Sequence, residues 1–190
     1  MTEIQRLALT ATFIAAVVSA GLAFSLVPHV ELVTFLVFTA GALLGPRSGA
    51  LVGALGLPLY VVANSAMRGF PPSPLPVLAA QSLGWAVVGL AGGLWRMLAY
   101  THPRRRRAAL VALPLCGVVL ALFTQALLNL VYATLLGDPG GPRLAVFLSG
   151  MSFGLLDMAM NGVVFLLAGP PTASALRRLA RERGWWGSAL

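Results

Sequence analysis

Apolar residues fill most of the chain in six long runs, separated by short segments that contain charged residues, proline or glycine. The runs cover approximately residues 7–27, 32–44, 49–67, 75–100, 108–136 and 144–169. A helix needs about 20 apolar residues to cross a bilayer, where it satisfies its own backbone polar groups. The runs lack the alternation of barrel strands. The pattern therefore predicts an all-α membrane bundle of six transmembrane helices, with a short second span that is tilted, kinked at Pro46 or extended toward Pro28.

The placement of the 13 basic residues, all of them arginines, predicts the orientation of these spans. A cytoplasmic N-terminus puts only Arg68 and Arg143 outside. The inner side then receives Arg6, Arg47, Arg96, Arg104, Arg105, Arg106, Arg107, Arg177, Arg178, Arg181 and Arg183. By the positive-inside rule we expect a multi-pass protein of a prokaryotic cell membrane with both termini in the cytoplasm. Topology and contact with lipid headgroups account for these arginines, so they do not indicate nucleic-acid binding.

Composition supports this interpretation and excludes several kinds of chemistry. Hydrophobic residues make up 58% of the chain and charged residues 9%, outside the usual range for a soluble domain. We expect one transmembrane domain with a short basic cytoplasmic tail at about 170–190, and a retained first span. Cys116 is the only cysteine, and His29 and His102 fall at span ends on opposite sides, so no metal cluster is expected. Without lysine there is no phosphate-binding glycine loop, and we expect neither a cofactor nor an enzyme.

A polar stripe crosses the fifth predicted span. Gln125, Asn129 and Tyr132 stand at positions i, i+4 and i+7, which places them on one face of a helix, in its outer half. Gln81, early in the fourth span, and Asn64, late in the third, also fall near the outer surface. Amides in membrane helices commonly form interhelical hydrogen bonds, each worth about 1 kcal/mol or less. The stripe is thus explained either by helix packing or by contact with a solute.

Asp157 is the one acidic residue inside a predicted span. An ionised carboxylate near the bilayer centre costs about 3 kcal/mol, so Asp157 needs a partner, a proton or water. Asn161 lies one turn further on the same face, and Gly150 and Gly154 precede Asp157 on nearly the same stripe. This face is expected to meet a neighbouring helix. Asp157 either contacts a ligand or couples transport to a proton, or it is a protonated or amide-paired residue that locks two helices together.

Small residues predict two close helix contacts. Ala11, Ala15 and Ser19 repeat every four residues in the first span, and Trp85 and Gly89 begin a similar repeat in the fourth. Such stripes let another helix approach closely. The spacing does not say whether the partner of the first span belongs to this chain or to another subunit.

Three strings resemble a known family. The first, from Gly45, reads Gly-Pro-Arg-Ser-Gly, and the second, from Gln81, reads Gln-Ser-Leu-Gly-Trp-Ala-Val-Val-Gly-Leu-Ala-Gly-Gly. Both are similar to strings in the substrate-binding S components of energy-coupling-factor (ECF) vitamin transporters. A third string, Ser-Gly-Met-Ser-Phe from Ser149, resembles the sixth helix of these proteins. It departs from the family where ligand contacts are expected, because Gly154 and Asp157 occupy the family's Asp and His positions.

The resemblance implies a function and a site. S components capture a vitamin or related small molecule from outside in a pocket built by the outer halves of their helices. They deliver it inward together with a transmembrane coupling subunit and two cytoplasmic ATPases. An Ala-x-x-x-Ala motif on the first helix docks to the coupling subunit, and Ala11 and Ala15 match it. The expected solute contacts are Asn64, Gln81, Gln125, Asn129, Tyr132, Asp157 and Asn161.

Two other functions compete with this interpretation. A membrane scaffold, similar in outline to the MreD-type cell-shape proteins, would use six helices to recruit other proteins, and would have no ligand and a packed outer half. A lipid-modifying enzyme would need an acid, base, nucleophile or metal near the membrane interface, and the sequence shows no such group of residues. The sequence does not identify the solute: cobalamin precursors and biotin-like and pantothenate-like compounds all remain candidates.

Overall fold

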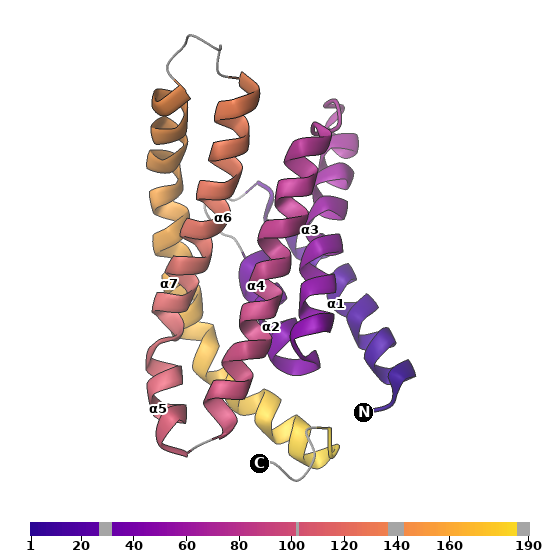
Figure 1. Cartoon of the computed structure of the whole chain (residues 1–190). Helices are drawn as coiled ribbons and strands as arrows, with labels where there is room; N and C mark the ends of the chain where they lie inside the picture. The colour runs from indigo at the N-terminus through magenta and orange to yellow at the C-terminus, as the bar shows by residue number, and fades with distance from the viewer. Residues whose placement is uncertain (27–31, 102, 137–142, 186–190) are drawn as a thin grey trace.

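A computed structural model of the chain describes residues 1–26, 32–101, 103–136 and 143–185, and the regular structure within these ranges is helical (Figure 1). The helices are α1 (Glu3–Phe24), α2 (Leu32–Leu44), α3 (Pro46–Arg68), α4 (Leu75–Thr101), α5 (Pro103–Val111), α6 (Leu113–Leu136) and α7 (Arg143–Glu182). Some predicted features lie outside the described residues. They are the end of the first predicted span at residue 27, the two histidines His29 and His102, and the last five residues of the predicted tail.

Five of the helices, α1, α3, α4, α6 and α7, are long and apolar enough to cross a membrane. Helix α2 is apolar but has only 13 residues, so it extends for about 20 Å at 1.5 Å per residue. That is shorter than the hydrocarbon core of a bilayer, which is about 30 Å thick. The helical class expected from the sequence is confirmed, with five candidate spans and one shorter apolar helix.

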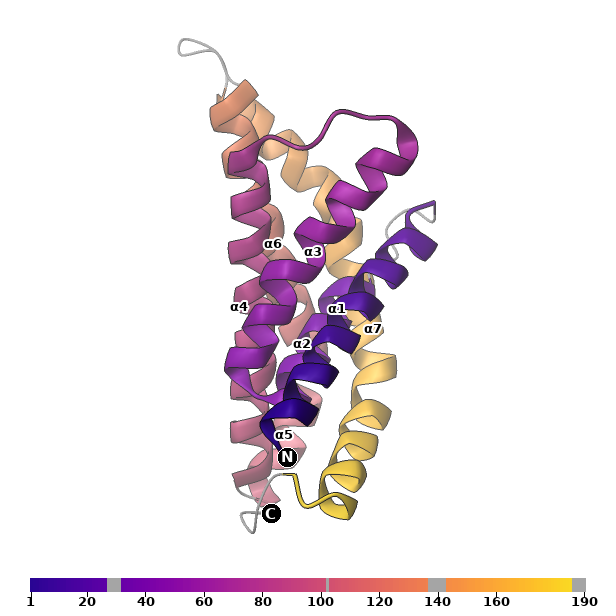
Figure 2. The ribbon, with the colours of Figure 1, turned by 90° about the vertical axis from the view of Figure 1, so that its right-hand side faces the viewer.

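The helices form a bundle with two distinct ends. Helix α1 begins and α7 ends at the same end, which we call the terminal end (Figures 1 and 2). Helices α3 and α6 end, and α4 and α7 begin, at the opposite or far end. Helix α2 lies in the terminal half, packed against α1, α3, α4 and α7. Ten of its residues are buried, as expected for a helix that is apolar on all sides.

The fifth predicted span is divided into two helices. Residues 108–136 were expected to form one helix, but α5 ends at Val111 and α6 begins at Leu113. Pro114 explains the division, because its ring lacks an N–H and clashes with the carbonyl group four residues earlier, whereas the first turn of a helix tolerates proline. Residues 103–111 therefore form a separate arginine-rich helix at the terminal end (Figure 1).

The last helix continues beyond the predicted span. The run was expected to end at residue 169, but α7 extends through Pro170 and Pro171 to Glu182, and its final part takes a different direction (Figure 1). Two consecutive prolines remove backbone donors and account for the change of direction. Burial of Ala173 and Leu176 keeps the segment packed on the bundle. Much of the predicted basic tail is thus helical.

Helices α2, α3 and α4 meet at glycines. A Cβ atom on Gly49 would collide with the backbones of Gly41 in α2 and Gly89 in α4, and a Cβ atom on Gly53 would collide with the backbone of Trp85. These contacts join backbone to backbone, with no flexible side chain between the helices. We call the contact of Gly41, Gly49 and Gly89 the glycine junction. It contains Gly49 and Gly89 from two of the family-like strings, so these two glycines serve packing here.

Candidate functional site

Helices α6 and α7 pack closely because glycines of α7 lie opposite amide side chains of α6. A Cβ atom on Gly150 would collide with the amide group of Asn129, and one on Gly154 would lie 3.2 Å from Cγ and Cδ of Gln125. The stripe predicted on residues 125 and 129 therefore faces the glycines predicted on residues 150 and 154. The interface of α6 and α7 contains most of the candidate polar residues.

Asp157 has an amide partner within this interface. Nε2 of Gln125 donates a hydrogen bond to Oδ2 of Asp157, with a donor–acceptor distance of 2.8 Å. One turn further along α7, Nδ2 of Asn161 donates to the backbone oxygen of Asp157 at 2.9 Å. The Asp157 side chain is partly buried. This geometry matches the alternative in which an amide-paired Asp157 locks two helices, and it also leaves a carboxylate beside the other amides.

Six polar side-chain atoms in the described chain are buried without a hydrogen-bond partner, and they lie on four of the helices. One of them, Nε of Arg177, lies near the end of α7, and the other five form the candidate group. Three belong to predicted site residues: Oε1 of Gln81, Nδ2 of Asn129 and Oδ1 of Asn161. The other two, Oγ1 of Thr34 and Nε1 of Trp85, were not predicted, because Thr34 lies in an apolar run and Trp85 was assigned to packing. Such an atom costs about 1–3 kcal/mol, so each needs an explanation.

Packing contacts place several of the five residues on neighbouring turns of different helices. The ring of Phe165 meets Phe35 edge-on, with 5.2 Å between ring centroids, so Thr34 and Asn161 lie on turns at a similar height. The Cβ position of Gly84 lies 3.5 Å from side-chain atoms of Thr124 and Leu127. The α4 turn that begins at Gln81 is therefore adjacent to the α6 segment that carries Gln125 and Asn129. The atoms lie between the start of α2 and the far end.

One further predicted site residue, Asn64, has its contacts elsewhere, and another, Tyr132, lies at the surface. Oδ1 of Asn64 accepts a hydrogen bond from Nε of Arg68 at 3.1 Å, and Nη2 of Arg68 donates to the backbone oxygen of Ser25 at 3.0 Å. Asn64 thus helps to join the end of α3 to the end of α1. Tyr132 follows Asn129 on α6, and 38% of its surface is exposed.

The small-residue stripe of α1 is exposed. Ala11, Ala15 and Ser19 all lie on the surface, whereas Thr10 and Val17 face the interior, where α1 packs against α3 and α2. The partner predicted for this stripe is therefore not one of the helices that pack against α1 within the described chain.

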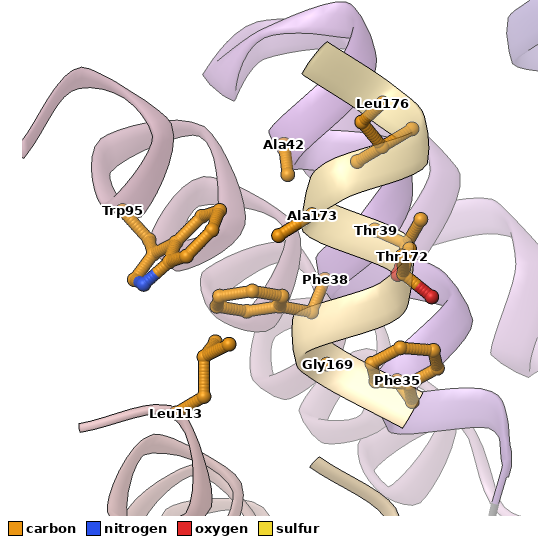
Figure 3. A pocket seen from close by; sticks show the side chains of 10 residues that line it. All are labelled: Phe35, Phe38, Thr39, Ala42, Trp95, Leu113, Gly169, Thr172, Ala173 and Leu176. Carbon is orange, nitrogen blue, oxygen red and sulfur yellow. The ribbon is translucent and has the colours of Figure 1, made fainter. Parts of the chain in front are cut away.

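A hollow in the terminal half is apolar and small (Figure 3). Helices α2, α4, α6 and α7 line it with Phe35, Phe38, Thr39, Ala42, Trp95, Leu113, Gly169, Thr172, Ala173 and Leu176. Its volume is about 10 Å³. That is room for about one water molecule, so the hollow does not hold a vitamin-sized solute.

The described residues contain no group of three or more His, Cys, Asp or Glu side chains that could hold a metal ion. The chemistry of the candidate site is therefore that of amides, a carboxylate, a hydroxyl and an indole. In comparisons with known proteins, no family model, no curated protein and no solved structure matches the chain.

Proposed function

We propose that the chain is the substrate-capture subunit of an ECF-type importer. In this proposal it crosses the cell membrane with both termini in the cytoplasm and binds a vitamin or related small molecule from outside. It then delivers the solute inward with a transmembrane coupling subunit and two ATPases. The far end of the bundle would face outward. This orientation puts Arg6, Arg47, the arginines of α5 and those near the end of α7 on the cytoplasmic side, as the positive-inside rule favours.

The observation that carries the proposal is the set of buried, unpartnered polar atoms on Thr34, Gln81, Trp85, Asn129 and Asn161. Two are carbonyl oxygens, which accept hydrogen bonds, two are N–H groups, which donate, and a hydroxyl does both. A neutral solute with both donors and acceptors would satisfy such a set, whereas an apolar lipid would not. Asp157 adds a carboxylate that would favour a solute N–H or O–H group.

The exposed stripe of Ala11 and Ala15 supports the proposed assembly with a coupling subunit. Small residues let two membrane helices approach closely, and a stripe on the lipid-facing side of α1 is available for a helix of another protein. The docking role itself comes from the resemblance to the family motif.

The hydrogen bond between Gln125 and Asp157 favours a second candidate function. Together with Gly150 and Gly154 it makes α6 and α7 a closely packed pair, which suits a scaffold of the MreD type. In a scaffold the unpartnered atoms would remain a cost of packing, and no solute would bind.

Native mass spectrometry of the protein purified from its own host separates the two functions. A stoichiometric adduct of vitamin size, released on activation, would support capture and identify the solute. A protein that is reproducibly empty, and whose unfolding temperature does not respond to a panel of vitamins, would support the scaffold.

Replacing Ala11 and Ala15 by Leu tests the proposed docking surface. We expect solute binding to persist, because neither residue is buried, and copurification with the coupling subunit to be lost, because leucine would block close approach of the two helices. Leucine at Ala79 and Ala159, exposed residues on α4 and α7, provides the matched control. Normal assembly of the Ala11 and Ala15 variant would exclude this surface.

A further inference from the structure

Three arginines from two helices gather at the terminal end. Arg106 belongs to α5, and Arg177 and Arg181 stand one turn apart on α7. Arg177 is close enough to both Arg106 and Arg181 for their charges to interact, and Tyr100 interacts in the same way with Arg106 and Arg177. We call Arg106, Arg177 and Arg181 the arginine cluster.

The helices that carry the cluster are held together by hydrogen bonds from aromatic side chains. The hydroxyl of Tyr100 donates to the backbone oxygen of Ala173 at 2.8 Å, which ties the end of α4 to α7. Nε1 of Trp95 donates to the backbone oxygen of Ala109 at 3.0 Å, which ties α4 to α5. The rings of Trp95 and Tyr100 also meet edge-on, with centroids 5.9 Å apart. The fold therefore fixes the relative positions of the helices that carry the three arginines.

Among the residues that the structure describes, no carboxylate pairs with the cluster. In the described part of the chain, neither Arg106 nor Arg177 nor Arg181 makes an ion pair. The adjacent Arg178, by contrast, lies 3.8 Å from Glu182 on an exposed face. Nε of Arg177 is buried and has no hydrogen-bond partner. Three neighbouring cations repel one another, and a buried guanidinium N–H without an acceptor adds a further cost. An anion at this place would remove both costs.

The position of the cluster indicates the source of the anion. Tyr100 and Trp185 are half-buried at the same end of the bundle, and aromatic residues at helix ends are typical of the level of lipid headgroups. Guanidinium groups bind phosphate with paired, charge-assisted hydrogen bonds. Basic pockets between membrane helices on the cytoplasmic side bind anionic headgroups. We propose that Arg106, Arg177 and Arg181 form a binding site for the phosphate headgroup of an anionic phospholipid, independently of any solute site.

Lipid titration of the full chain, monitored by native mass spectrometry, distinguishes lipid binding at this site from general attraction of lipids by surface charge. The probe is phosphatidylglycerol, with phosphatidylcholine as the zwitterionic reference. The site variant replaces Arg106, Arg177 and Arg181 by Gln, and the control variant replaces the exposed Arg105, Arg178 and Arg183 by Gln. Both lose three positive charges at the same end. We expect the site variant to lose about tenfold more affinity for phosphatidylglycerol than the control, because only the former loses paired hydrogen bonds to phosphate. An equal loss in both variants would overturn the proposal.

Thermal unfolding gives a second readout that does not depend on lipid counting. Without anionic lipid, the site variant should be at least as stable as the original protein, because the repulsion between three cations is gone. Phosphatidylglycerol should raise the unfolding temperature of the original and control proteins but not that of the site variant. Arg177→Gln alone repeats the test if the triple variant does not fold. If millimolar inorganic phosphate gives the same stabilisation without lipid, the site takes a soluble anion and the lipid assignment is wrong.

Discussion

The glycine junction of α2, α3 and α4 and the interface of α6 and α7 both depend on glycine, but glycine has a different effect in each. At the junction, Gly41, Gly49 and Gly89 bring backbones together, and the surrounding residues are apolar. At the other interface, Gly150 and Gly154 make room for the amide side chains of α6. A backbone cannot move without moving its helix, whereas an amide can change rotamer. The first region is therefore suited to fixing the fold and the second to accommodating a solute.

The largest expected effect is at the glycine junction. Gly89→Leu would place a side chain against the backbone of Gly49, and α3 and α4 would have to separate. We expect the free energy of unfolding to fall by about 3 kcal/mol or more, at the upper end of the cost of overpacking. Thermal unfolding in detergent measures the change. Gly84→Ala is the control, because its Cβ would sit at an ordinary contact distance of 3.5 Å, and an equal loss there would contradict the backbone explanation.

Asp157→Ala examines whether the polar interface binds a solute. The variant should still insert into the membrane, but its solute affinity should fall about tenfold, as expected from the loss of one hydrogen bond to the solute. Isothermal titration with the identified solute measures the loss. Asp157→Asn, which can still accept a hydrogen bond from Gln125, should lose less. Unchanged affinity together with lower stability would make Asp157 a purely structural residue.

Thr34→Val separates a binding role from a packing role at a fully buried position. Oγ1 of Thr34 has no partner, so replacing the hydroxyl by a methyl group should raise the free energy of unfolding by about 1 kcal/mol. If the hydroxyl contacts a solute, affinity should fall in the same variant. Greater stability with unchanged affinity would remove Thr34 from the site.

The smallest expected change in stability comes from Gly154→Ala, which compares the rigidity of the α6–α7 interface with that of the glycine junction. The new Cβ would lie 3.2 Å from side-chain atoms of Gln125, which must shift by a few tenths of an ångström. We expect less than about 1 kcal/mol of lost stability, because an amide side chain relaxes more easily than a backbone. Solute affinity should fall severalfold, since Gln125 holds Asp157. A loss as large as that of Gly89→Leu would show that the two interfaces are equally rigid.

The apolar pattern predicted the helices better than it predicted where they end. Residues 75–100 and 49–67 correspond closely to α4 and α3, because a long apolar run in a membrane must satisfy its backbone within its own helix. The division before Leu113 and the extension of α7 beyond Pro171 were not predicted. Proline lowers local helix stability, but the outcome depends on what the following residues pack against. Leu176 is buried by the bundle, and the sequence does not contain that information locally.

For the candidate site, helical spacing correctly placed Gln125 and Asn129 on one face and Gly150 and Gly154 on another. It did not show that these faces meet, that Gln125 bonds Asp157, or that Asn64 instead holds Arg68. Whether the group binds a solute stays a prediction.

The helical class, the apolar runs and the faces that carry polar residues follow from the amino-acid sequence, because these features depend on residues within a few turns of one another. Which polar atoms find partners depends instead on how the helices pack together. The bond between Gln125 and Asp157 joins residues 32 positions apart, and the unpartnered atom of Thr34 is buried by helices distant in the sequence. Hydrogen bonding and burial of this kind depend on which residues are neighbours in space. The periodicity of a single helix does not specify those neighbours.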